Sequence, residues 1–165
     1  MVRTVHQLYK AILWCLKPKV QPPLVWYWDS IDMGNVVKDR IKKFEVDEGR
    51  SYSDVTALWD PETEAIHATM KLSRDKLGLI IMWLLHELAH ANGIGMVESD
   101  GEKQADDWAL IQFRKLVRSK RWKEATSIKL GLKRGAHNCV PDDRVWTKPP
   151  RLPIYQPPWT LERYQ

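Results

Sequence analysis

The chain has 165 residues, 44% of them hydrophobic and 28% charged, an ordinary globular composition that is long enough to bury a core in one domain. Its two cysteines, Cys15 and Cys139, lie far apart and form no CxxC pair, which argues against a disulfide framework or a zinc ribbon. The longest apolar run, Gly78–Leu85, falls far short of the roughly 20 residues that cross a bilayer, and Ala11–Leu16 is too short for a secretory signal, so we expect a cytoplasmic protein with no membrane span.

The first part of the chain alternates between helical and strand-forming segments. Val5–Leu16 has the pattern of a short amphipathic helix that prolines end. Leu24–Trp28 is rich in β-forming residues and predicts a strand, and the charged segment Asn35–Phe44 predicts a helix. Two further strands are expected at Val55–Trp59 and Glu64–Leu72, because the Asp-Pro-Glu-Thr sequence between them favours a turn.

Three helices are predicted after these strands. Ser73 is suited to cap the first, which is apolar nearly all round and runs to Asn92, where Asn-Gly favours a stop. The second spans 99–117, with Glu102 placed for a capping box. A third, basic helix is predicted at Trp122–Leu132.

The composition changes after residue 135. Six of the last thirty residues are proline, interleaved with aromatic residues, which predicts an extended tail over 136–165 that packs on the domain or on a partner. We therefore expect an α+β domain over 1–135, with a small, mostly antiparallel sheet packed on helices, followed by this tail.

The most informative segment is His86-Glu87-Leu88-Ala89-His90, an HExxH motif. Residues four apart lie on one face of a helix, so His86 and His90 can bind one metal ion. Glu87 lies about 100° further round the helix, from where it can reach a metal-activated water without ligating the metal. The motif predicts a zinc hydrolase site.

A zinc site needs at least a third protein ligand. The candidates after His90 are Glu98, Asp100, Glu102, Asp106, Asp107 and His137. On a helical projection Glu102 falls inside the apolar stripe of its helix and Asp106 at the edge of that stripe, whereas Asp107 faces solvent. A carboxylate on a buried stripe is costly unless it is paired or bound to metal. Glu102 is therefore the predicted third ligand, and Asp106 is predicted to orient a ligand histidine.

Simpler roles remain open for these carboxylates. In one alternative, Glu102 is a capping-box residue with no role in metal binding. In another, Asp106 is an ordinary helix carboxylate or an ion-pair partner. Glu98 is the alternative third ligand.

HExxH followed by Glu102-Lys103-Gln104-Ala105-Asp106 resembles the HExxH and ExxAD pattern of gluzincin peptidases, which include the ImmA/IrrE-like proteins and the CAAX-type endopeptidases. The resemblance covers about twenty-five residues, with a looser match of layout over 55–72. It implies a minimal zincin fold, zinc bound by His86, His90 and Glu102, Glu87 as the base, and Asp106 in support. The spacing from His90 to Glu102 is short for this group, and the membrane spans of its second branch are missing from the sequence.

These residues predict a zinc metallopeptidase in which Glu87 removes a proton from the attacking water and delivers it to the leaving nitrogen. We expect a protein or peptide substrate to lie extended at the sheet edge, on or near Glu64–Leu72. His67, His137 and Tyr155 are the candidates for a second oxyanion donor, and structural roles for all three remain open.

The region Arg114–Arg134 carries nine Lys or Arg residues and one acid, whereas His86–Asp107 carries six acids and one Lys. The basic region predicts a nucleic-acid or acidic partner, or else a solvated helix face. Two other functions therefore compete with the peptidase: a DNA-associated protease of the SprT type, and a non-catalytic regulatory binding protein of phage or plasmid kind on a zincin scaffold. SprT-type proteases take a histidine as third ligand, and no histidine lies between 90 and 137.

Overall fold

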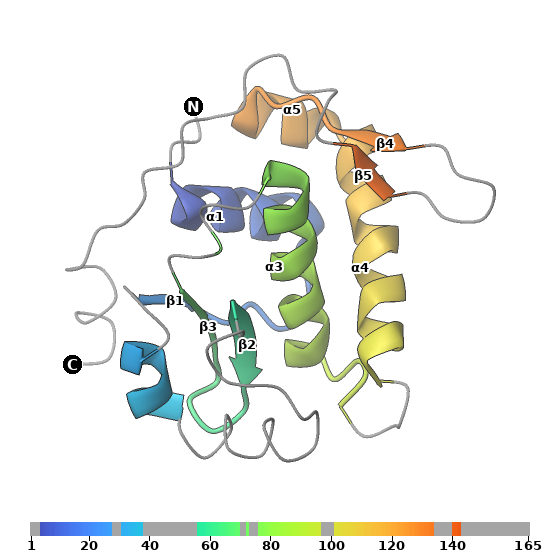
Figure 1. Cartoon of the computed structure of the whole chain (residues 1–165). Helices are drawn as coiled ribbons and strands as arrows, with labels where there is room; N and C mark the ends of the chain where they lie inside the picture. The colour runs from blue at the N-terminus through green and yellow to red at the C-terminus, as the bar shows by residue number, and fades with distance from the viewer. Residues whose placement is uncertain are drawn as a thin grey trace.

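The protein folds as a small α+β structure, shown as a computed structural model in Figure 1. The described residues are 4–27, 31–37, 56–69, 72, 76–96, 101–133 and 140–142. Most of the predicted tail, together with Ser99, lies outside these residues. None of the described helices combines the length and the apolar sequence that crossing a bilayer demands.

Among the described residues, three strands form the main sheet, in the order β1-β3-β2. The central strand β3 (Ala65–Thr69) is parallel to β1 (Leu24–Tyr27) and antiparallel to β2 (Ala57–Asp60). The expectation of a mostly antiparallel sheet was wrong for this sheet, which is mixed. The chain between β1 and β2 includes a helical segment at 31–37, and so long a connection lets β1 and β3 run in the same direction.

The predicted turn joins β2 to β3 in a hairpin. Residues 61–64 form the turn, and Glu64 adopts a positive φ of 52°. Asp60 stabilises the turn, because its Oδ1 accepts a hydrogen bond from the Glu62 backbone N–H at 3.1 Å and its Oδ2 accepts one from the Thr63 hydroxyl at 2.9 Å. The two strands are shorter than the predicted segments, but they lie within or beside them.

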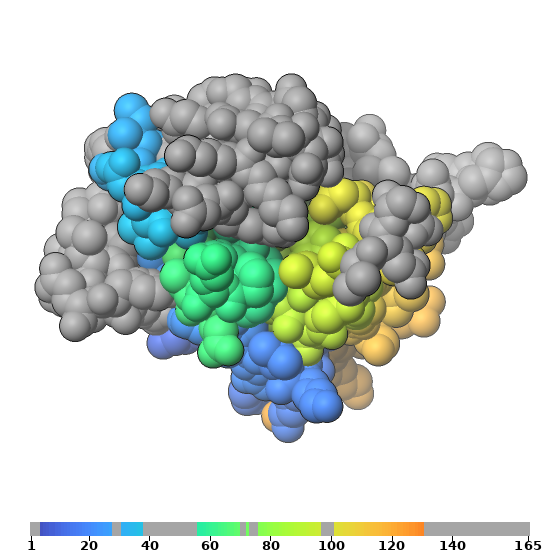
Figure 2. All heavy atoms as spheres, turned by 90° about the horizontal axis from the view of Figure 1, so that it is seen from below, coloured from blue at the N-terminus to red at the C-terminus, as the bar shows by residue number. Residues whose placement is uncertain are grey.

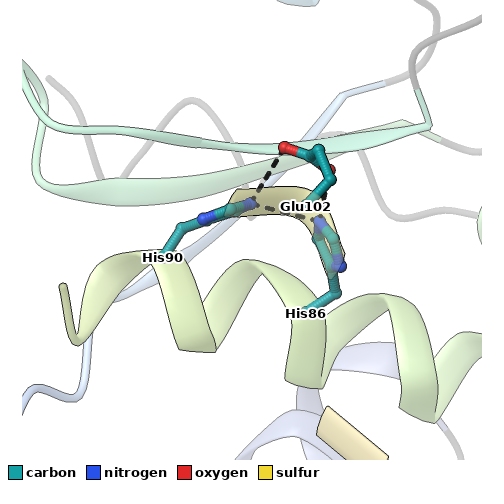
Figure 3. A group of neighbouring side chains, drawn as sticks. All are labelled: His86, His90 and Glu102. Carbon is teal, nitrogen blue, oxygen red and sulfur yellow. Dashed lines mark hydrogen bonds and ion pairs between the residues drawn. The ribbon is translucent and has the colours of Figure 1, made fainter. Parts of the chain in front are cut away.

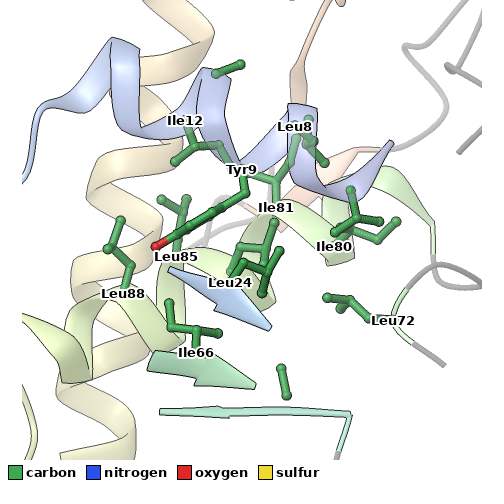
Figure 4. Close-up of a cluster of buried hydrophobic side chains, with 14 of the residues drawn as sticks. Leu8, Tyr9, Ile12, Leu24, Ile66, Leu72, Ile80, Ile81, Leu85 and Leu88 are labelled. Atoms are coloured by element: carbon green, nitrogen blue, oxygen red, sulfur yellow. The ribbon is translucent and has the colours of Figure 1, made fainter. Parts of the chain in front are cut away.

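The core lies between the sheet and the helices. Alternate strand residues such as Leu24, Ile66 and Ala68 belong to the large cluster that also contains the apolar faces of α1 (Val5–Leu16) and α3 (Leu77–Ala91) (Figure 4). The residues between them in the strands pack instead with the 31–37 segment in a second, smaller cluster. The sheet therefore has two buried faces, and only one of them meets α3.

The helices follow the sequence closely, with two corrections. Helix α1 has the predicted bounds and is capped by the Thr4 side chain. Helix α3 begins after Lys76, so Ser73 is not its N-cap. Helix α4 (Gly101–Arg118) ends one residue beyond the predicted position.

The second correction concerns the end of the predicted third helix. Helix α5 (Lys120–Thr126) ends at Ser127, which adopts a left-handed conformation with a φ of 58°, so the helix does not extend to Leu132. The chain continues into β4 (Gly131–Lys133), which pairs antiparallel with β5 (Val140–Asp142). Strand β5 lies within the segment predicted as a tail, and the division of the chain at 135 stays a prediction.

Candidate metal centre

Helix α3 places the HExxH motif on the side of the helix that faces β2 and α4. The helix packs along α4 and beside β2, and it ends at Ala91 with Asn92 as C-cap, as the Asn-Gly sequence predicts. His86, Glu87 and His90 are all buried, each with 9% or less of its surface exposed. Three ionisable groups are thus held within one turn of a largely apolar helix.

The two imidazole rings turn the same nitrogen toward each other. His86 Nε2 lies 3.1 Å from His90 Nε2, and the rings meet edge to face. The opposite nitrogen of each ring is held by the protein: His86 Nδ1 lies 2.7 Å from Asp106 Oδ1, and His90 Nδ1 lies 3.0 Å from the Ile94 carbonyl oxygen. Because those oxygens can only accept, each Nδ1 donates its proton, and in the neutral ring each Nε2 keeps a lone pair.

Glu102 completes a three-residue group around these lone pairs (Figure 3). Its Oε2 lies 2.9 Å from His86 Nε2, and its Oε1 lies 3.3 Å from His90 Nε2. One ligand atom from each of His86, His90 and Glu102 lies within 4.8 Å of the others, so the group could hold a metal ion. The sequence reasoning expected a buried carboxylate here, whereas the Glu102 side chain is 69% exposed and approaches the histidines from the rim.

A close backbone approach brings Glu102 to the histidines. After α3, Gly93 and Gly95 adopt positive φ values of 82° and 72°, and Gly95 lies directly against Gly101, the first residue of α4. A Cβ added to either Gly95 or Gly101 would overlap the carbonyl of the other. The two glycines thus allow the first turn of α4 to lie beside the last turn of α3. Figure 2 shows the β2–β3 hairpin and the end of α3 side by side on this face of the molecule.

The edge of the sheet holds the motif glutamate. The Thr69 N–H donates to the Thr56 carbonyl, and because such pairs alternate along antiparallel strands, the Trp59 backbone N–H points away from β3. It donates instead to Glu87 Oε2 at 2.7 Å. This bond fixes one oxygen of Glu87 and orients the carboxylate beside the histidine pair.

Burial and the neighbouring charged groups shift the pKa values at the centre. Burial lowers the pKa of His86, but the Glu102 hydrogen bond, with Glu87 and Asp106, outweighs it and raises that pKa to about 9. Burial raises the pKa of Glu87 to about 7 against the charge of both histidines. The hydrogen bonds from both histidines hold the pKa of Glu102 well below its usual range. The group therefore has a strong preference for a positive charge at its centre.

The other predicted site residues are placed differently. His67 lies in β3 between Ile66 and Ala68, which face α3, so its ring is on the opposite face of the sheet. It is bonded there to Tyr27 and Thr63 and cannot act as an oxyanion donor at this site. Asp107 faces solvent as expected and pairs with Lys103 at 2.9 Å. The remaining candidates lie outside the described residues: Glu98, Asp100, His137 and Tyr155.

Two contributors to the site were missed by sequence reasoning. The Trp59 amide and the Ile94 carbonyl are backbone groups, so the residue type carries no sign of their roles. Glycines at 93 and 95 mark a turn after the motif, but they do not reveal which carbonyl would reach His90. Only the paired strand and the turn geometry place these two groups.

Comparisons with known proteins add no relative: no family model, no curated protein and no solved structure matches the chain. Two imidazole nitrogens with available lone pairs and one carboxylate make a nitrogen and oxygen donor set suited to zinc and other divalent transition metals.

Proposed function

We propose that this protein is a zinc-dependent metallopeptidase, with His86, His90 and Glu102 as metal ligands and Glu87 as the general base. The observation that carries the proposal is the orientation of the two imidazoles. Both Nδ1 atoms are occupied by Asp106 and Ile94, which directs both Nε2 lone pairs to one point beside Glu102. Three protein ligands leave coordination positions for water and substrate, as in catalytic zinc sites.

Bound zinc would act as a Lewis acid toward the substrate carbonyl and would make a nearby water more acidic. Glu87 is placed to do the proton transfers. The Trp59 N–H occupies Oε2, which leaves Oε1 to accept the proton of the attacking water and to pass it to the leaving amide nitrogen. Burial of Glu87 supports this role, because it raises the pKa of the carboxylate to about 7, so that the group can take up and release a proton near neutral pH.

We propose that the substrate lies along β2. The expectation was a position at the sheet edge, on or near Glu64–Leu72, and β3 within that segment is paired on both sides, so its backbone has no free edge. Strand β2 is an edge strand among the described strands, and Trp59 on its outer edge contacts Glu87. We propose that an extended peptide pairs with the outward-facing groups of this edge other than the Trp59 N–H, which Glu87 occupies, so that its backbone would pass the metal ligands.

The direct test is Glu87→Gln, with Glu124→Gln on the exposed surface of α5 as the matched control. A fluorogenic peptide mixture and labelled casein serve as substrates for the zinc-loaded protein. Loss of the base is expected to lower the cleavage rate about 10²–10⁴-fold, while bound zinc stays at one equivalent and Glu124→Gln cleaves normally. Equal cleavage by Glu87→Gln, or a zinc-loaded wild type that cuts none of the substrates, would contradict the proposal.

Metal content separates this proposal from a structural zinc site. Protein stripped by a chelator is expected to regain cleavage with zinc, and a cobalt-substituted sample should show a spectrum that changes when a hydroxamate inhibitor occupies the open positions. A metal that is bound but whose spectrum ignores every added ligand would indicate a closed site, and the chain would then be a binding protein on this scaffold.

A further inference from the structure

The end of the molecule formed by α1 and α5 carries a basic surface with an exposed tryptophan. On α1, Lys10 and Trp14 are spaced four residues apart, which places them along one side of the helix, and Lys17 follows as the C-cap residue. All three are exposed, and Trp14 keeps 46% of its surface open. Residues 4–27 contain no acidic residue.

Helix α5 extends this surface. It packs beside α1, and the Arg121 guanidinium lies 4.2 Å from the centre of the Trp14 ring. Lys120 and Arg121 are exposed, and among residues 111–133 the one acid is Glu124 against eight Lys or Arg. None of the ion pairs found among the described residues involves these cations. We call Lys10, Trp14, Lys17, Lys120 and Arg121 the α1–α5 basic face.

We propose that the α1–α5 basic face binds the phosphate backbone of nucleic acid. Four exposed cations, on α5 and on α1 with its C-cap residue, match a polyanion. An Arg stacked on an exposed Trp offers hydrogen-bond donors to phosphate and an aromatic ring on which a base can stack. An anionic membrane fits less well. The apolar side of α1 is buried in the core, so Trp14 is the single large apolar side chain that this face could insert.

The position of this face keeps it apart from the metal centre. Helix α4 runs from Glu102 at the centre to Arg118 beside α5 (Figure 1), and its 18 residues at roughly 1.5 Å each span about 27 Å. Nucleic acid on the α1–α5 basic face would therefore leave the metal centre open to a protein bound nearby. Binding of nucleic acid to this face does not require peptide hydrolysis at the metal centre.

The test measures binding of a fluorescein-labelled 20-base-pair duplex and a 20-nucleotide single strand by anisotropy at several salt concentrations. The protein carries Glu87→Gln, so that the result is independent of peptidase activity. The logarithm of the binding constant is expected to fall linearly with the logarithm of the salt concentration. The triple variant Lys10→Gln, Lys17→Gln, Arg121→Gln should bind on the order of tenfold or more weakly, and its salt slope should fall by about 0.9 for each phosphate contact removed from a duplex.

Controls separate charge, stacking and other anions. Lys103→Gln removes one cation at the metal-centre end of α4 and should leave binding unchanged, whereas Arg121→Lys keeps the charge and should lose only the stacking part, seen with the single strand. The proposal is overturned if the triple variant binds both nucleic acids as the parent does. It is also overturned if poly-glutamate or vesicles with 30% phosphatidylserine bind more tightly than the duplex at equal salt.

Discussion

Two groups of buried histidines in this protein differ in the partners of their ring nitrogens. His67, in the middle of the sheet, has both ring nitrogens occupied: Tyr27 lies 2.7 Å from Nδ1 and Thr63 lies 2.6 Å from Nε2. Since the Thr63 hydroxyl donates to Asp60, it accepts from Nε2, and Tyr27 donates to Nδ1. His86 and His90 have only Nδ1 held in this way, and their Nε2 atoms converge beside a carboxylate.

The difference in pKa reflects these surroundings. Burial lowers the pKa of His67 to about 4, because the nearby Asp60 compensates only in part. At His86 burial also acts to lower the pKa, but three carboxylates raise it to about 9. A buried histidine whose partners satisfy both nitrogens of the neutral ring stabilises a fold. Two Nε2 atoms that converge on one carboxylate favour a positive charge there, either a proton on a ring or a metal cation.

The largest expected effect is loss of the proposed zinc ion from a variant that lacks one ligand. His90→Ala removes one of three protein ligands, and an even share of the roughly 10–16 kcal/mol of a zinc site corresponds to about 3–5 kcal/mol. We expect the variant to lose zinc on dialysis, as measured by atomic emission. His67→Ala should be destabilised yet keep one equivalent of zinc, and loss of zinc from that variant instead would place His67 at the metal centre.

Acid sensitivity is the second test. The pKa of His67 is lower in the folded protein, about 4 against 6.5, so between these values the unfolded chain binds a proton that the folded protein does not. The contribution of neutral His67 is complete above pH 6.5 and falls by about 3 kcal/mol as the pH falls to 4.

Urea unfolding from pH 7 to pH 4, in wild type and in His67→Gln, measures this loss. The difference between the two isolates one titrating group, since His86 and His90 are present in both. We expect the free energy of unfolding of His67→Gln to fall less steeply with decreasing pH. Parallel curves would show that His67 keeps an ordinary pKa in the fold.

Removing the charge of Asp106, which contacts His86 Nδ1, is expected to have a smaller effect on zinc binding. In Asp106→Asn the amide oxygen can still accept from His86 Nδ1, but the negative charge that strengthens the ligand is lost, and we expect zinc affinity to fall about 10–100-fold. Competition with a chromogenic chelator measures the change. Asp107→Asn on the same helix, whose carboxylate pairs with Lys103 in solvent, should bind zinc like wild type, and an equal loss in both variants would mean that Asp106 acts only through general charge.

The two histidine groups also mark how far the sequence allowed prediction. The spacing of HExxH predicts that His86 and His90 share one face of α3, and the four-residue spacing of Glu102 and Asp106 predicts that they share one face of α4. The meeting of these two faces depends on the close approach of Gly95 and Gly101, which the spacing does not predict. The role of His67 could not be read, since strand alternation leaves open which face of a sheet meets which helix. The parallel pairing of β1 and the end of α5 at Ser127 depend on long-range contacts and a left-handed residue, which no local pattern in these segments signals.

The smallest expected effect concerns His67, the histidine whose two ring nitrogens both have partners. Tyr27→Phe removes the hydroxyl that donates to His67 Nδ1, and loss of one such hydrogen bond is expected to cost about 1 kcal/mol at pH 7. Because that bond favours the neutral ring, its loss should also raise the pKa of His67, which NMR titration of the ring protons can follow. Tyr9→Phe is the matched control: its hydroxyl donates to the Pro22 carbonyl, so it should cost similar stability without moving the pKa of His67. If Tyr27→Phe leaves that pKa in place, burial alone keeps His67 neutral, and the contrast with His86 rests on the carboxylates rather than on which nitrogens are satisfied.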